Sequence, residues 1–109
     1  MTVLKNPALL RTQSYINGQW ISVEKTFPVL NPYDGSVIAN VANVGVHEAK
    51  QAIEAAHKAG LEWRNVPLQQ RIDFLLRWAE QVKMNTADLT LLLTLEQGKP
   101  LAQANNEIT

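Results

Sequence analysis

Short apolar runs separated by turn residues make up the first 45 residues of the chain. Two of these runs, residues 14–16 and 19–21, flank the dipeptide Asn17-Gly18. This dipeptide is typical of a type I′ β-turn, because both central positions of that turn require a positive φ. The pattern therefore predicts a tight β-hairpin near the start of the chain.

A second pair of runs follows, at residues 26–30 and 37–42. Pro28 interrupts the first run, and a proline confines a strand to a sheet edge or makes it irregular. Residues 31–35 between the runs are rich in turn formers. We expect a small antiparallel or mixed sheet, with one face of the second strand formed by Val37, Ala39 and Val41.

The apolar spacing changes to a helical period after Gly45. Gly45 is a tolerated N-cap, and Glu48 stands three residues later, as in a capping box. The first helix is expected to end near Gly60. Its apolar stripe is made of small residues, which implies close approach to a neighbouring element: Ala49, Ala52, Ile53, Ala56 and Ala59.

Three further helices are predicted beyond this point. Pro67 suits the first turn of the second helix, and residues 85–88 resemble a cap for a third helix containing Leu89, Leu92 and Leu93. Gly98 is a natural stop, and Pro100 can open a fourth helix. The second helix carries a long apolar stripe at helical spacing: Leu68, Ile72, Leu75, Leu76, Ala79 and Val82.

The element order is strands first and helices afterwards, without a repeated βαβ unit. This order predicts an α+β fold or the N-terminal portion of something larger. The 109 residues allow one domain at most. The final helical pattern, residues 101–109, lacks a termination signal, so we expect a chain that is cut short.

Composition and charge exclude several classes of function. Ten basic and ten acidic residues cancel, so no global field would attract nucleic acid or an anionic membrane. Without cysteine the chain can form neither a disulfide nor a thiolate nucleophile. It shows no secretory signal and no apolar run that could span a membrane, so we expect a cytoplasmic protein.

Few residues offer chemistry. His47 and His57 lie about 80° apart around one helix, without metal-ligand spacing, and are interpreted as surface residues. Glu96 followed by Gly98-Lys99 could suggest a base beside a phosphate loop. However, the second glycine and the following Ser or Thr of a P-loop are missing, so a helix stop with a complementary lysine is favoured.

Three tryptophans, Trp20, Trp63 and Trp78, are scattered along the chain without a basic stripe beside them. This favours core anchoring or rim packing over a nucleic-acid platform. The sequence also lacks a glycine-rich dinucleotide motif and a nucleophile elbow. The residues alone therefore indicate a domain without a visible active site.

Four motifs in order resemble the N-terminal segment of the aldehyde dehydrogenase superfamily. They are residues 15–20 (Tyr-Ile-Asn-Gly-Gln-Trp), residues 31–35 (Asn-Pro-Tyr-Asp-Gly), Trp63-Arg64 with Arg71, and residues 95–100 (Leu-Glu-Gln-Gly-Lys-Pro). Residues 94–102 are most similar to the succinate-semialdehyde dehydrogenase branch. The resemblance identifies residues 1–109 as a partial N-terminal, coenzyme-binding domain that lacks the dinucleotide-binding core and the catalytic domain.

The resemblance implies a longer, homo-oligomeric enzyme that oxidises an aldehyde with NAD or NADP. A cysteine thiolate attacks the carbonyl, an asparagine helps to hold the oxyanion, and a glutamate activates water. All of these residues fall beyond position 109, so the chain itself is expected to carry no catalytic, cofactor-binding or metal residue. A monovalent cation in several members is bound by groups that match the Leu30 carbonyl and the Glu96 side chain, with a third ligand beyond the chain.

Two alternatives remain open. The chain could act alone as a small helical interaction domain, or it could be a non-catalytic truncated remnant. Against the interaction domain stands the short fourth helix, since an isolated helix below about 12–15 residues is marginal in water. Its apolar residues Leu101, Ala104 and Ile108 are expected to lack their usual partners.

Overall fold

The computed structural model describes residues 3–109, and its helices and strands follow the predicted order. The elements are a 3₁₀ turn at Pro7–Leu9, β1 (Ser14–Ile16), β2 (Gln19–Ile21), β3 (Thr26–Leu30), β4 (Val37–Ala42), α1 (Val46–Trp63), α2 (Leu68–Met84), α3 (Thr86–Gln97) and α4 (Leu101–Ile108). The predicted α+β arrangement is confirmed, with the strands in two separate antiparallel pairs.

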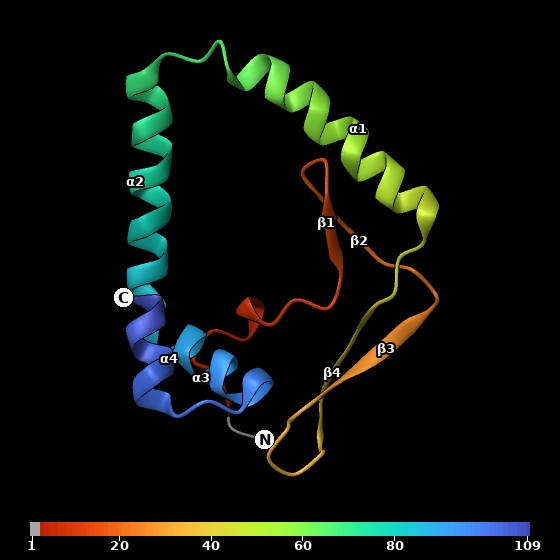
Figure 1. The fold of residues 1–109 in the computed structure, drawn as a ribbon, viewed down its shortest axis with the longest axis vertical. Helices are drawn as coiled ribbons and strands as arrows, with labels where there is room; N and C mark the ends of the chain where they lie inside the picture. Colours follow the sequence, from red (N-terminus) through yellow and green to blue (C-terminus); the bar gives the residue numbers. More distant parts are fainter. Residues whose placement is uncertain (1–2) are drawn as a thin grey trace.

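The chain is flat and open. Figure 1 shows α1 and α2 as two sides of a frame, with α3 and α4 at the foot of α2 and the strands below α1. The extents are 47 × 34 × 20 Å and the radius of gyration is 16.7 Å. A compact chain of this length has a radius of gyration of about 13 Å, so much of the surface that a compact fold would bury stays open.

The first hairpin has the predicted turn. Asn17 and Gly18 take φ angles of 50° and 76°, and β1 pairs with β2 so that Tyr15 lies opposite Trp20. Asn tolerates the left-handed region better than most residues, and Gly enters it at no steric cost. Ile16 of β1 is buried.

The second hairpin differs from the expected alternation in β4. Val29 pairs with Ala39 and Leu30 pairs with Val37, so Ile38 is an extra residue in a β-bulge. Ile38 is buried, whereas Val37 is 53 % exposed. The predicted apolar face of Val37, Ala39 and Val41 is therefore wrong at its first position, because a bulge shifts the side-chain alternation by one residue.

Helix α1 begins where predicted but ends three residues later than predicted. The Gly45 N–H donates to Oε2 of Glu48 at 3.0 Å, which is one half of a capping box. Gly60 was expected to stop the helix, yet its carbonyl accepts from the Arg64 N–H at 3.1 Å. Gly60 does not adopt a positive φ, and the helix instead ends at Trp63, just before Asn65, whose side-chain amide donates to the Leu61 carbonyl.

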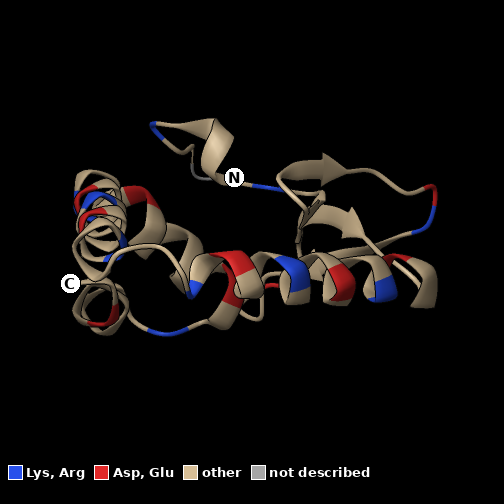
Figure 2. Cartoon of the chain, turned by 90° about the horizontal axis from the view of Figure 1, so that it is seen from above, with Lys and Arg blue, Asp and Glu red and all other residues tan. Residues whose placement is uncertain are grey.

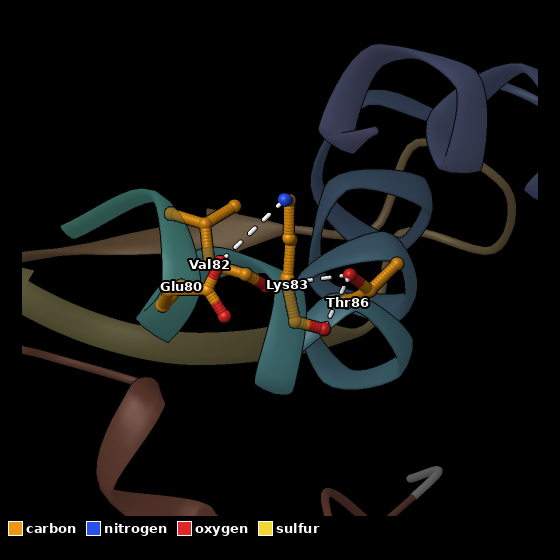
Figure 3. A network of polar contacts seen from close by, with 4 residues as sticks. All are labelled: Glu80, Val82, Lys83 and Thr86. Carbon is orange, nitrogen blue, oxygen red and sulfur yellow. Dashed lines mark hydrogen bonds and ion pairs between the residues drawn. The ribbon is translucent and has the colours of Figure 1, made fainter. Parts of the chain in front are cut away.

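Helices α2 and α3 meet at a sharp junction that a single hydroxyl stabilises (Figure 3). Thr86 Oγ1 lies 2.8 Å from the Lys83 carbonyl and 3.3 Å from the Val82 carbonyl. It therefore supplies a further donor for carbonyls at the end of α2, where the Val82 carbonyl also accepts from the Asn85 N–H at 3.1 Å. The Asn85 side chain also donates backwards, to the Gln81 carbonyl, and so does not cap α3 as the sequence suggested.

Helix α3 stops at Gly98, as predicted. Gly98 has φ 75°, and its N–H donates to the Thr94 carbonyl at 2.8 Å. Pro100 then precedes α4, which packs against α3. The expectation that the apolar residues of α4 lack partners is wrong for Ala104, which is completely buried, although Leu101 stays 56 % exposed.

A buried carboxylate ties the start of the chain to α3. Asp88 is only 6 % exposed, and its two carboxylate oxygens accept hydrogen bonds from the backbone N–H groups of Lys5 at 2.9 Å and Asn6 at 2.8 Å. Leu4, immediately before them, is buried. The best-buried part of this end of the molecule is thus formed by the first residues together with α3 and α4.

Candidate functional site

The two histidines lie on the surface of α1, as predicted. His47 and His57 are both exposed. Among residues 3–109, three or more His, Asp or Glu side chains never come close enough to hold a metal ion. The structure therefore supports the interpretation of the histidines as surface residues.

The segment around Gly98-Lys99 forms a helix stop and not a phosphate loop. Glu96 is exposed at the end of α3. The Lys99 ammonium forms an ion pair with the Glu107 carboxylate of α4, which the sequence did not indicate. Since this ion pair links the α3–α4 turn to α4, the lysine has a structural partner within the chain.

The tryptophans pack at the rim of the fold and not in its core. Trp20 and Trp63 are 40 % and 42 % exposed, and Trp78 is 67 % exposed. Trp20 packs against Tyr15 in a tilted arrangement with ring centroids 4.9 Å apart, and the Arg11 guanidinium lies 4.3 Å from the Trp20 ring centroid. Rim packing is therefore the arrangement seen for these three, since no second layer formed by residues 3–109 covers the elements that carry them.

Charge is spread over the molecule in both signs. Figure 2 shows acidic and basic residues alternating along α1. They include Glu48, Lys50, Glu54, Lys58 and Glu62. Such alternation does not form the one-sided basic stripe that nucleic-acid backbones require. Within the described residues, no helix is both long and apolar enough to cross a membrane.

Two carboxyl groups have lowered pKa values, and both belong to turns or caps. The hydroxyl and backbone N–H of Ser36 donate to Asp34 at 2.7 Å and 2.9 Å and hold the pKa of its carboxyl below the usual value. Backbone N–H groups of Glu48 and Gly45 lower the pKa of the Glu48 carboxyl in the same way. These shifts reflect local hydrogen bonds from the Ser36 hydroxyl and from backbone N–H groups, which is a structural role.

The segments that carry the two candidate cation ligands meet at one point. A β-carbon placed on Gly98 would lie only 2.9 Å from Cγ of Pro32, so the turn after β3 contacts the end of α3. Leu30 and Glu96 each lie two residues before this contact. The expectation that this chain carries no metal residue by itself stays a prediction.

The most conspicuous surface of the chain is apolar. We call the six residues of the predicted apolar stripe of α2 the α2 stripe: Leu68, Ile72, Leu75, Leu76, Ala79 and Val82. No residue of α1 or α2 is buried. Sequence periodicity located the α2 stripe, and it shows which side of a helix is apolar but not what covers it.

Comparisons with known proteins agree on one family. The aldehyde dehydrogenase family model matches residues 20–109. The 3-sulfolactaldehyde dehydrogenase of Pseudomonas putida is 42 % identical over 99 % of this chain and 23 % of its own length. The NADP(+) succinate-semialdehyde dehydrogenase 2 of Schizosaccharomyces pombe is 48 % identical over 89 % of this chain and 20 % of its own length.

A solved structure shows the same fold. The succinate-semialdehyde dehydrogenase of Burkholderia pseudomallei matches with a TM-score of 0.93 and 43 % identity. The match covers 98 % of this chain and 23 % of the Burkholderia chain. The chain thus spans about a fifth of the length of its curated relatives.

Proposed function

Because this chain belongs to the aldehyde dehydrogenase family, we propose that it forms the outer, N-terminal part of the coenzyme-binding domain of an NAD(P)-dependent dehydrogenase. The proposed substrate is succinate semialdehyde. The observation that carries this proposal is the match of nearly the whole chain to the Burkholderia succinate-semialdehyde dehydrogenase at a TM-score of 0.93.

The names of the relatives support a substrate class. Succinate semialdehyde and 3-sulfolactaldehyde are both short aldehydes with an anionic group at the far end. We propose this class for the complete enzyme, with oxidation of the aldehyde to a carboxylic acid. NADP is named for the Schizosaccharomyces relative and for a similar Escherichia coli enzyme, and NAD for a similar Corynebacterium enzyme, so we propose NAD(P) without a choice between the two.

Within the proposed enzyme the chain is scaffold. The chain has no cysteine, so the nucleophile of the family lies elsewhere. The three described glycines with positive φ, at positions 18, 35 and 98, lie in three separate turns. They do not form the strand–turn–helix that holds a pyrophosphate, so the residues present do not fit the coenzyme.

A chimera tests this proposal. These 109 residues would replace the matching segment of the Burkholderia enzyme, and reduction of NAD and of NADP would be followed with succinate semialdehyde. We expect turnover by the chimera and none by the 109 residues alone. A folded chimera that fails to oxidise any semialdehyde would contradict the proposal, and turnover by the purified chain alone would contradict its scaffold role.

The stand-alone interaction domain stays the alternative. The burial of Ala104 shows that α4 finds a partner within the chain, which removes one argument against that alternative. The exposed α2 stripe still favours the enzyme hypothesis, since a monomeric domain rarely leaves so much apolar helix surface open. The truncated remnant differs from the enzyme hypothesis only in lacking the rest of the polypeptide.

A further inference from the structure

The turn of the first hairpin combines a side-chain amide with an unobstructed backbone nitrogen. Asn17 and Gly18 are exposed, and among residues 3–109 neither the Asn17 amide nor the Gly18 N–H has a hydrogen-bond partner. A β-carbon placed on Gly18 would meet no atom within 4 Å. Water reaches the turn, because an open groove of about 400 Å³ between the hairpin and α1 is lined by Asn17 together with Glu54 and Lys58.

An asparagine amide in this setting is open to attack by the nitrogen of the next residue. The Gly18 nitrogen forms a bond to Cγ of Asn17 and gives up its proton to water, while the Cγ–Nδ2 bond breaks and Nδ2 leaves as ammonia. Water then opens the five-membered succinimide ring. Cleavage of the bond between Cγ and the Gly18 nitrogen gives aspartate. Cleavage of the bond to the backbone carbonyl carbon gives isoaspartate, in which the main chain runs through Cγ.

The backbone of Asn17 already has an angle that favours this ring closure. Its φ is 50°, and Asn17 is the only residue other than glycine with a positive φ among residues 3–109. A planar ring also needs a ψ of about −120°, the value at the first central position of a type II′ turn, because the next nitrogen then eclipses Cβ. Types I′ and II′ both join strands through two residues and share the positive φ at that position. One flip of the 17–18 peptide therefore reaches the reactive geometry while β1 and β2 stay paired.

A similar pair, Asp34-Gly35, lies in the turn between β3 and β4, and its reacting groups are occupied. The Asp34 carboxylate accepts from the N–H and the hydroxyl of Ser36 at 2.9 Å and 2.7 Å. The Gly35 N–H donates to the Asn31 carbonyl at 2.8 Å. Elsewhere the following residue obstructs the attack: valine follows Asn40, Asn43 and Asn65, and proline, which has no N–H, follows Asn6 and Asn31.

We propose that Asn17 is a site of spontaneous deamidation, and that isoaspartate at this position irreversibly opens the first hairpin. Isoaspartate adds one atom to the main chain of a turn that has only two residues. The register in which Tyr15 lies opposite Trp20 depends on the length of that turn. The contact of these two rings, with centroids 4.9 Å apart, and the buried position of Ile16 should therefore be lost together.

Peptide mapping of the aged chain tests the site. The 109-residue chain is kept at mildly alkaline pH, and mass spectrometry follows the conversion of each asparagine, with fragmentation that separates aspartate from isoaspartate. We expect Asn17 to be converted at least about tenfold faster than Asn40, Asn43 and Asn65, because valine is branched at Cβ and glycine has no side chain. Asp34 should yield no isoaspartate over the same time.

NMR tests the effect on the hairpin. Nuclear Overhauser contacts between the Tyr15 and Trp20 rings report the closed hairpin in the fresh chain. We expect these contacts to be lost in the isoaspartate form and to persist in Asn17→Asp. This variant carries the same new charge on a main chain of normal length, and aspartate tolerates a positive φ. It therefore separates the effect of the charge from the effect of the longer main chain.

Three results would overturn the inference. The first is conversion of Asn17 that is no faster than conversion of the asparagines that precede valine. The second is a contact between the Tyr15 and Trp20 rings that survives in the isoaspartate form. The third is equal loss of this contact in Asn17→Asp, because the charge and not the longer main chain would then open the hairpin.

Discussion

Removal of the Asp88 carboxylate should release residues 3–10 from α3. Asp88→Ala deletes the acceptors of two backbone N–H groups, those of Lys5 and Asn6. The rest of α3 keeps its helical hydrogen bonds. The perturbation is therefore local, and its effect is expected at the N-terminal segment and not at the α3–α4 pair.

The size of the effect follows from the geometry of the two bonds. Both are short, at 2.9 Å and 2.8 Å, and the carboxylate that accepts them is 6 % exposed. A hydrogen bond to a charged group contributes about 1.5–3 kcal/mol. Lys5 and Asn6 are exposed, so water replaces part of the lost bonding when the segment opens. We expect a loss of about 2–3 kcal/mol, which corresponds to about 30- to 150-fold more opening.

Hydrogen exchange measured by NMR gives a direct readout. The amides of Leu9 and Leu10 donate to the Asn6 and Pro7 carbonyls and do not touch Asp88, so they report release of the whole segment. Their protection should fall by that factor in Asp88→Ala and by less in Asp88→Asn, which keeps one acceptor. Glu96→Ala on the same helix is the control. Unchanged exchange in Asp88→Ala would show that burial of Leu4 alone anchors the segment.

Two further predictions concern turns. Gly98→Ala should lower the free energy of unfolding by more than the roughly 1 kcal/mol that a positive φ costs, because its new β-carbon meets Pro32. Gly35→Ala, the control, should show the φ cost alone. Equal shifts of the urea midpoint in the two variants would contradict this. Ser36→Ala should raise the pKa of Asp34 towards its usual value. Because the folded pKa is lowered, the stability from this carboxylate is present at neutral pH and is lost as pH falls through the folded pKa. An NMR titration of Asp34 that is unchanged in Ser36→Ala would contradict the role given to the Ser36 hydroxyl.

Local signals in the sequence predicted local structure well. Asn17-Gly18 and Gly98 each require a left-handed backbone, and each formed the predicted turn or stop. Gly60 failed as a stop because glycine permits the left-handed region without enforcing it, and the α1 helix simply continued. Ile38 was missed because a bulge depends on the pairing partner, which a single strand does not show.

The candidate site could be predicted only in part. The lone histidines and the helix stop at Gly98 were interpreted correctly, since both interpretations depend on spacing along one helix. The contact of Asp88 with the Lys5 and Asn6 N–H groups was not predicted, because these donors lie 83 and 82 positions away in the sequence. The α2 stripe was located correctly from its helical spacing, but that spacing does not show what covers it, and its covering surface is not formed by any described residue of this chain.

The contact of Asp88 with Lys5 and Asn6 also has a consequence for the order of events during protein synthesis. Chains grow at about 5–20 residues per second, so about 4 to 16 seconds separate Asn6 from Asp88 on the ribosome. Hairpins form within about 10 μs, so both strand pairs can close long before that. Leu4 therefore leaves the ribosome without its buried position, and the first segment made is among the last to be fixed.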